Sequence, residues 1–316
     1  MGKLAFIFPG QGSQVVGMGK DLIEQNEAAR AIFEQADKTL GVALTDIILN
    51  GPEERLTKTE NTQPALLTVS TALLTLLKDK GITPDYVAGH SLGEYSALVA
   101  AGAMTFEEAV YAVRNRGLLM EEAVPAGQGA MAAILGLKAE KLEAVCQAVT
   151  EAGESVQLAN LNSSSQIVIS GTKLGVEQAS EQAKEAGAKR VIPLNVSGPF
   201  HSALMKPAAE KFKSVIDNIS VKEADIPVIA NVTADMVSDH QEIKRLLIEQ
   251  LYSPVRWVET VEKLLALGVD TFIEVGPGKV LSGLVKKVDR KANIFAVGDL
   301  ETLIQTVNEL NEVGQS

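Results

Sequence analysis

The pentapeptide Gly-His-Ser-Leu-Gly at residues 89–93 has the form of a nucleophile elbow. In an elbow, two glycines permit a strained turn between a strand and a helix, which exposes the serine hydroxyl and directs the next backbone N–H at the substrate. Ser91 is therefore the candidate nucleophile, and Leu92 is the candidate donor of that N–H. A serine in this setting points to acyl transfer through a covalent serine ester.

A second donor for the oxyanion is expected in the glycine-rich segment Pro-Gly-Gln-Gly-Ser-Gln at residues 9–14, because elbow enzymes take one from an early strand-to-helix loop. Gln11 lies between two glycines and suits this role. A dinucleotide-binding loop would require Gly or Ala where Val15 stands and an acidic residue after a second strand. A phosphate-binding loop would require Gly-Lys-Ser/Thr, which is missing here.

The serine needs a base, and three histidines are available. His90 adjoins Ser91, so its side chain should point away from the hydroxyl, and His240 stands in a polar stretch typical of a helix start. By elimination His201 is the candidate base. No acidic residue stands out as its partner, and the order serine, then histidine well before the chain end differs from that of α/β-hydrolases. A backbone carbonyl could orient the imidazole instead.

The elements that must position these residues follow from the apolar pattern. Residues 4–8 are expected to form a buried strand followed by a glycine-rich loop, and residues 21–40 and 63–80 have helical spacing. A strand is expected at 86–89 and a helix at 92–101, so that strand, turn and helix meet at Ser91.

Residues 129–194 have a different order of elements. Strands are expected at 131–135, 156–161, 166–170 and 190–194, and helices at 139–152 and 176–186. This β-α-β-β-α-β order is ferredoxin-like. We therefore expect a small ferredoxin-like subdomain at 126–197, inserted into a large α/β-hydrolase-like subdomain with a mostly parallel sheet made of 1–125 and 198–316. The large subdomain should gain strands at 227–231 and 271–275 and helices at 241–251 and 258–267.

Composition restricts the classes of function. The net charge of −11 argues against non-specific nucleic-acid binding, and apolar stretches broken before spanning length argue against a membrane segment. A single cysteine, Cys146, excludes an internal disulfide and fits a reducing compartment, so a cytoplasmic location is expected.

At this point a family resemblance is visible, carried by seven motifs in order along essentially the whole chain. They are Gly-Gln-Gly-Ser-Gln at 10–14, Thr-Gln-Pro-Ala at 62–65, Gly-His-Ser-Leu-Gly-Glu at 89–94, Arg116 with Met120, Gly-Pro-Phe-His at 198–201, Gln-Leu-Tyr-Ser-Pro at 250–254 and Glu-Val-Gly-Pro-Gly at 274–278. The chain resembles the malonyl-CoA:acyl-carrier-protein transacylases of bacterial fatty acid synthesis.

The resemblance implies Ser91 as nucleophile and His201 as base, with the N–H groups of Gln11 and Leu92 as oxyanion hole. It implies that the main-chain carbonyl of Gln250 orients His201.

The resemblance also assigns residues to the substrate. It implies that Arg116 binds the malonyl carboxylate, whereas the residues alone favour a surface cation on a helix. Other positions implied to line the site are Gln63, Met120, Asn160, Asn162 and Phe200. Phe200 matches malonyl-selective domains, in which a bulky residue leaves no space for an α-methyl branch, although one methyl is typically worth only about 1–3 kcal/mol.

The resemblance implies a ping-pong reaction in which malonyl passes from malonyl-CoA to Ser91 and then to the phosphopantetheine thiol of acyl carrier protein. No metal or redox cofactor is required, and the family suggests a monomer. Because carrier and chain are both acidic, docking should use a local basic patch, either Lys189 with Arg190 or the cluster at 286–291.

Two rival functions stay open. One is a thioesterase using the same Ser91 and His201, and the other is a non-catalytic module that binds a nucleotide through its glycine-rich loops.

Overall fold

The computed structural model describes residues 2–125 and 127–315, with side chains up to residue 312. The strands in chain order are β1 (Lys3–Phe8), β2 (Tyr86–Gly89), β3 (Gly129–Leu135), β4 (Val156–Ser163), β5 (Gln166–Thr172), β6 (Arg190–Pro193), β7 (Val228–Ile229), β8 (Met236–Val237), β9 (Val269–Val275) and β10 (Asn293–Val297).

The α-helices are α1 (Lys20–Gln25), α2 (Glu27–Leu40), α3 (Leu44–Asn50), α4 (Glu53–Thr57), α5 (Thr59–Asp79), α6 (Gly93–Ala100), α7 (Phe106–Ala123), α8 (Ala139–Glu151), α9 (Lys173–Glu185), α10 (Lys206–Asp217), α11 (His240–Glu249), α12 (Trp257–Ala266), α13 (Val280–Val288) and α14 (Leu300–Gln315), and a 3₁₀ turn, η1 (Ala203–Met205), precedes α10. Among the described residues, no helix combines the length and the apolar character that a membrane crossing requires.

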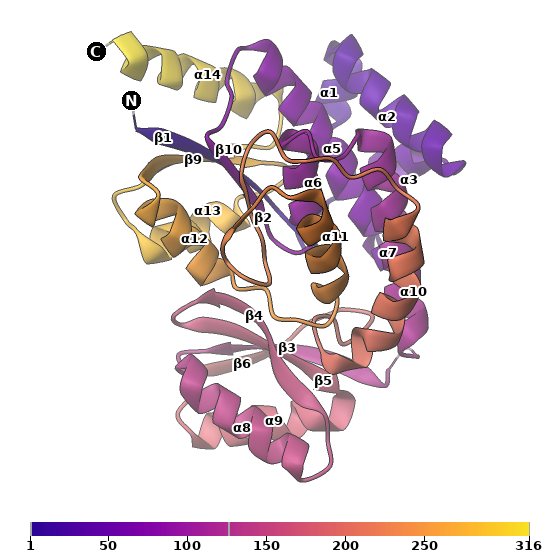
Figure 1. The fold of residues 1–316 in the computed structure, drawn as a ribbon, viewed down its shortest axis with the longest axis vertical. Coiled ribbons are helices and arrows are strands. Elements are labelled where there is room, and N and C mark those ends of the chain that lie inside the picture. The colour runs from indigo at the N-terminus through magenta and orange to yellow at the C-terminus, as the bar shows by residue number, and fades with distance from the viewer. Residues whose placement is uncertain (1, 126, 316) are drawn as a thin grey trace.

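A six-stranded mixed sheet forms the centre of the larger part of the molecule. Its strand order is β10-β9-β1-β2-β7-β8, and every neighbouring pair is parallel except β7 with β8. Successive side chains of β1 point to opposite faces. Phe6 and Phe8 pack into one core with α5 and α7, whereas Ala5 and Ile7 pack into a second core with α12 and α13 (Figure 1). Both faces are covered, which explains why β1 is apolar throughout.

A four-stranded antiparallel sheet in the order β4-β5-β3-β6 forms the smaller part, drawn below the large sheet in Figure 1. On one face, Ile134 and Ile169 pack against Leu142 of α8 and Val176 of α9. On the other face, Met131 belongs to the core of the larger part. The small sheet therefore has one face turned to its own helices and one turned to the rest of the molecule.

The expected elements are present, but several bounds differ. The single helix expected at 21–40 is wrong: Asn26 has extended backbone angles, and its side chain accepts a hydrogen bond from Ala29 N, so it ends α1 and caps α2. Helix α5 begins at Thr59 rather than residue 63, so Pro64 lies inside the helix, and the Glu60 carbonyl that Pro64 cannot bond accepts from Arg114 NH1 at 2.8 Å instead. The strand expected at 227–231 is reduced to Val228–Ile229.

Candidate active site

The elbow at Ser91 joins the end of β2 to the start of α6. Ser91 has a φ of 51°, a left-handed conformation that costs a non-glycine residue free energy. A Cβ on Gly89 would lie 1.9 Å from the carbonyl carbon of Gly93, and a Cβ on Gly93 would lie 2.1 Å from the carbonyl oxygen of Phe8. A side chain at either position would overlap the backbone, so only glycine fits and the two glycines permit this tight turn.

His201 lies against the serine. Its Nε2 is 2.8 Å from Ser91 Oγ, and its Nδ1 is 2.8 Å from the carbonyl oxygen of Gln250. Because a carbonyl can only accept, Nδ1 carries the proton, and Nε2 is left to accept from the serine hydroxyl. Burial, followed by the charge of Arg116, lowers the pKa of His201 to about 3, so the imidazole is neutral near pH 7. The pair has the geometry and protonation state of a base and its nucleophile.

The backbone of His201 is fixed from two sides. It has a φ of 58°, its N–H donates to Leu251 O at 3.1 Å, and its carbonyl accepts from Gln157 Nε2 at 3.2 Å. Leu251 follows α11, whereas Gln157 belongs to β4 of the small sheet. The imidazole is thus held at the junction of the two sheets.

Arg116 of α7 is a buried cation, 1% exposed, that also reaches the serine. Its NH1 donates to Gln63 Oε1 at 2.7 Å, and its NH2 donates to Ser91 Oγ at 3.1 Å and to Gln250 Oε1 at 2.9 Å. Its Nε has no hydrogen-bond partner in the described part of the chain. The surface cation favoured by the residues alone is therefore wrong, because α7 packs closely on α5 and turns this side chain inward.

The close packing of those two helices depends on Gly117. A Cβ at this position would lie 2.7 Å from Glu60 Cα in α5. The glycine lets the helix backbones approach, which brings Gln63 of α5 within reach of Arg116.

A cavity of about 110 Å³ opens at the serine. Its lining includes the nominated residues Gln11, Ser91, Leu92, Arg116, Met120, Asn160, Phe200 and His201. The backbone N–H groups of Gln11 and Leu92 donate to no other group within the described residues. A neighbouring cavity of about 290 Å³ shares Gln11, His90 and Asn160 with the first and extends to Gln166 and to α13.

Three nominated residues are not part of this lining: Gln250, whose carbonyl faces His201, Gln63 and Asn162. Gln63 is fully buried and contacts Arg116 and, through its Nε2 at 3.6 Å, the sulfur of Met120. Asn162 lines the neighbouring cavity, and its Oδ1 is 2.8 Å from His90 Nε2. The ring of His90 also packs on Trp257, with 5.6 Å between the centroids. His90 makes these contacts instead of bonding to the serine hydroxyl, as expected from its place in the elbow.

Asn231 was not identified from the sequence as a residue of the site. Asn231 Oδ1 accepts from Ser91 N at 2.7 Å, and Asn231 Nδ2 donates to Gly89 O at 2.6 Å. Asn231 follows β7, the neighbour of β2, so its place at the carboxyl edge of the parallel strands was the available signal.

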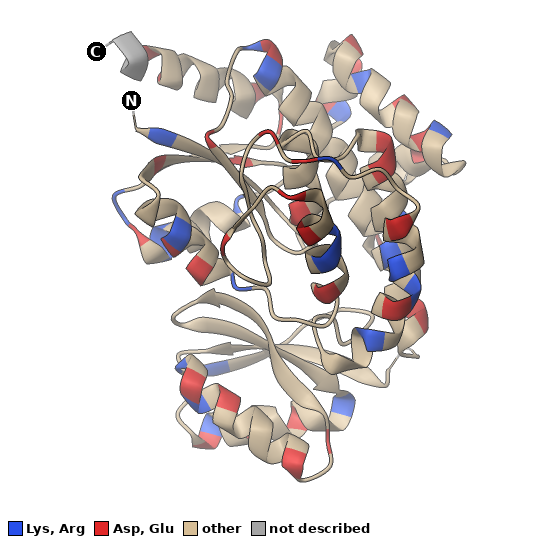
Figure 2. Ribbon diagram, viewed as in Figure 1, with Lys and Arg blue, Asp and Glu red and all other residues tan. Residues whose placement is uncertain are grey.

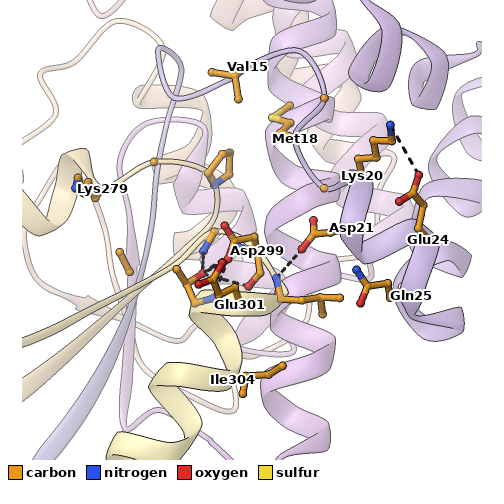
Figure 3. Close-up of a pocket in the computed structure, with 18 of the residues that line it drawn as sticks. Val15, Met18, Lys20, Asp21, Glu24, Gln25, Lys279, Asp299, Glu301 and Ile304 are labelled. Atoms are coloured by element: carbon orange, nitrogen blue, oxygen red, sulfur yellow. Dashed lines mark hydrogen bonds and ion pairs between the residues drawn. The ribbon is translucent and has the colours of Figure 1, made fainter.

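A larger hollow of about 1060 Å³ lies elsewhere, between residues 15–25, the turn at 277–279 and the start of α14 (Figure 3). None of the nominated residues, all of which are described, lines it. Its acidic Asp21 accepts from Leu300 N at 2.7 Å, and Lys20 pairs with Glu24 at 3.9 Å. Both contacts join residues that themselves line the hollow.

Comparison with known proteins agrees with a serine acyl-transfer site. A family model described as an acyl transferase domain matches residues 5–307. The chain is 63% identical over 315 residues to malonyl CoA-acyl carrier protein transacylase of Bacillus subtilis, which covers 99% of each chain. It is 48% identical over 301 residues to the protein of the same name from Staphylococcus aureus, covering 95% of this chain and 97% of that one.

Solved structures are similar as well. An acyl carrier protein S-malonyltransferase from Vibrio cholerae has a TM-score of 0.94 and 48% identity, covering 96% of this chain and 99% of that one. A malonyl-transacylase solved in complex with its type II PKS acyl-carrier protein has a TM-score of 0.94 and 45% identity, covering 97% of this chain and 99% of that one. The chain belongs to the malonyl CoA-acyl carrier protein transacylase family of acyl transferase domains.

Proposed function

We propose that the protein transfers a malonyl group from malonyl-CoA to the phosphopantetheine thiol of acyl carrier protein, as part of fatty acid synthesis. One observation carries the proposal: Ser91 Oγ lies within hydrogen-bond distance of both a neutral imidazole and a buried guanidinium. The imidazole activates the hydroxyl, and the guanidinium selects an acyl group that bears its own carboxylate. The relatives support the same substrates by their names.

In the first half of the reaction, Ser91 Oγ attacks the thioester carbonyl while its proton passes to His201 Nε2. The Gln250 carbonyl holds the Nδ1 proton and stabilises the imidazolium that forms. The C–S bond then breaks, and His201 returns the proton to the departing CoA sulfur. In the second half the carrier thiol gives its proton to His201 and attacks the serine ester. The ester C–O bond then breaks, and His201 passes the proton to Ser91 Oγ, which restores the free hydroxyl and the neutral imidazole. No step calls for a metal or a redox cofactor.

A tetrahedral oxyanion forms in each half of the reaction, and its stabilisation is assigned to the backbone N–H groups of Gln11 and Leu92. Their free amides and their place in the lining at Ser91 support this assignment. Arg116 is assigned to the malonyl carboxylate, since it is a cation that lines the cavity at Ser91 and a guanidinium can donate two parallel hydrogen bonds to a carboxylate. Phe200, 5% exposed at the cavity wall, is assigned to the exclusion of an α-branched acyl group.

The neighbouring cavity is assigned to the pantetheine arm of either substrate. It begins at Gln11 and His90 beside the serine and ends at Gln166 and α13, which gives a thiol a route to the ester. Asn160 and Asn162 lie along this route as polar contacts for the amides of the arm.

The two candidate docking groups converge at the end of that route. Lys287 Nζ donates to Gln166 Oε1 at 2.8 Å, and Leu135 is paired with Gln166 on one side and with Arg190 on the other. Elsewhere, red and blue segments are interspersed over the outer helices (Figure 2). We propose that Lys189, Arg190 and the basic residues at 286–291 form one docking patch for an acidic carrier.

We also propose the classes and boundaries of the two subdomains. The observed order of elements from β3 to β6, with strands in the order β4-β5-β3-β6, supports a ferredoxin-like subdomain at 126–197. Its first boundary, residue 126, lies outside the described residues. The flanking parts, 1–125 and 198–316, are proposed as one α/β-hydrolase-like subdomain, supported by the elbow at the end of β2. A cytoplasmic location and a monomeric state complete the proposal.

The proposal is tested by intact-protein mass spectrometry after mixing with malonyl-CoA. The wild type is expected to gain one malonyl group, Ser91→Ala none, and acyl carrier protein is expected to remove the label faster than buffer does. A label that decays equally fast with and without carrier thiol would assign the chain to the thioesterases. Full activity of Ser91→Ala would leave only a binding role.

A further inference from the structure

Glu94 is a buried carboxyl beside the nucleophile. It lies in the first turn of α6, three positions after Ser91, and is 3% exposed. Its Oε2 accepts from Gln250 Nε2 at 2.7 Å and from Asn231 N at 3.1 Å. One oxygen thus joins two segments that are distant in the sequence and that both contact the reacting residues.

The first contact fixes the amide of Gln250. Gln250 Oε1 accepts from Arg116 NH2, whereas Gln250 Nε2 donates to Ser91 O at 3.1 Å and to Glu94. Because a guanidinium can only donate, the amide must present its oxygen to Arg116 and its nitrogen to acceptors. Glu94 supplies an acceptor on that side and so holds the residue whose carbonyl faces His201.

The second contact fixes Asn231. Its side chain accepts from Ser91 N and donates to Gly89 O, so it clamps the elbow from both sides of the serine. Ser91 is held in a strained left-handed conformation, which persists only where the surroundings determine it. By anchoring the backbone of Asn231, Glu94 supports that clamp.

We propose that Glu94 is a positioning residue for acyl transfer, whose carboxyl oxygen holds Gln250 and Asn231 and through them the orientation of His201 and the elbow of Ser91. This inference rests on the proposed function. Glu94 is not among the described residues that line the cavity, so it acts without touching the acyl group.

The role requires an acceptor rather than a charge. Burial raises the pKa of Glu94 to about 7, so the group is partly protonated under ordinary conditions, yet a proton on Oε1 leaves Oε2 free to accept both bonds. The carboxamide of Glu94→Gln presents an oxygen of the same reach. Glu94→Asp keeps the charge but withdraws the oxygen by one methylene.

The experiment measures the rate constant for malonyl-Ser91 formation by rapid quench and intact mass. Glu94→Ala is expected to slow acylation by about a hundredfold or more, Glu94→Gln is expected to stay within about tenfold of the wild type, and Glu94→Asp is expected to be slower than Glu94→Gln. If Glu94→Ala does not fold, the comparison of the amide with the shortened acid decides alone.

Asp37→Ala is the control. Asp37 of α2 is a partly buried carboxylate that accepts from Thr45 N at 2.8 Å, and it lines neither the cavity at Ser91 nor the neighbouring cavity. It is expected to lower the melting temperature as Glu94→Ala does while acylation stays within about threefold of the wild type.

Two results would overturn the inference: Glu94→Ala acylating within about tenfold of the wild type, or Glu94→Asp outperforming Glu94→Gln. Failure of the proposed function gives a different result, since the wild type itself would then acquire no malonyl mass.

Discussion

Arg116 is a buried cation held by neutral acceptors from three elements: Gln63, the Ser91 hydroxyl and the amide of Gln250. A buried charge without a counter-ion in hydrogen-bond contact is costly. Burial lowers the pKa of Arg116 accordingly. On the proposed function, an incoming carboxylate would relieve this cost, so we expect the charge of Arg116 to favour malonyl over acetyl.

We expect Arg116→Ala to reduce kcat/KM for malonyl-CoA by about a hundredfold or more, in line with about 3 kcal/mol for a hydrogen bond to a charged group. Acetyl transfer should fall far less. Steady-state kinetics with both thioesters checks the ratio, with Arg114→Ala as control, since Arg114 lies on the same helix but bonds Glu60 O. Equal losses for both substrates would contradict a carboxylate-binding role.

The neutral state of His201 sets a second expectation. Its pKa is lowered to about 3, and only the unprotonated imidazole can accept the serine proton, so the reactive form is present above pH 3 and lost below it. Between pH 8 and about pH 5 the acylation rate of folded enzyme should therefore show no loss from protonation of His201. The pH profile of the second-order rate constant for acylation, which reports the pKa values of the free enzyme, checks this, and an acid limb centred near the ordinary histidine value would contradict it.

The lowered pKa of His201 also makes the stability of the native state depend on pH. The unfolded state binds a proton on His201 below its ordinary pKa of 6.5, whereas the folded state does so only near 3. The native state therefore loses stability as the pH falls from 6.5 towards 3. Glu94 acts in the opposite direction, because its folded pKa is raised and its ionisation costs stability as the pH rises towards 7.

At the scale of elements, the elbow stores strain in the backbone of Ser91. Ser91→Ala and Ser91→Gly both remove the hydroxyl, but only glycine adopts a φ of 51° without a steric penalty. We expect the glycine variant to be more stable than the alanine variant by about 1 kcal/mol. Denaturant unfolding of the two inactive variants measures the difference, and an alanine variant of equal or greater stability would show that the turn is unstrained.

How much of this could be predicted from sequence differs between elements. The elbow was predictable because its glycines, strand and helix are contiguous, and β2 lies where the pattern indicated. The break in the helix expected at 21–40 was missed because the apolar spacing continues through Asn26, whose capping role depends on its own backbone angles.

The same limit applies to the site. Ser91 and His201 were found by motif and elimination, and the structure brings them to 2.8 Å. Glu94, Asn231 and Gln157 were not singled out, because a buried acceptor or amide is recognised by its partners, and those partners lie far away in sequence. The burial of Arg116 likewise depends on how α5 and α7 pack, which helical spacing alone does not determine.

At the scale of the whole molecule, the proposed docking patch combines residues from both parts of the fold: Lys287 from α13 of the larger part and Arg190 from β6 of the small sheet. Lys287 donates a hydrogen bond to Gln166 of β5. Gln166 is paired with Leu135 of β3, and Leu135 is paired on its other side with Arg190. If the proposed docking patch is correct, an acidic carrier would meet local positive charge here on a chain whose net charge is −11.

Charge reversal tests this arrangement. The pair Arg190→Glu and Lys287→Glu is expected to raise KM for acyl carrier protein by about tenfold at low salt, with a smaller effect at high salt because mobile ions screen exposed charges. KM for malonyl-CoA should rise less. Lys213→Glu, on α10 in an exposed pair with Asp217, serves as control. Equal increases for both substrates would mean that the patch binds phosphate groups in general.

The acceptor opposite His201 Nδ1 belongs to a peptide bond, since it is the carbonyl of Gln250. Every amino acid encoded at this position would still carry that oxygen. On the proposed mechanism, substituting each position in turn would identify the serine and the histidine but not this orienting group, because no change of side chain removes a backbone carbonyl. Replacing the amide that follows residue 250 with an ester would weaken the carbonyl as an acceptor and so test its role.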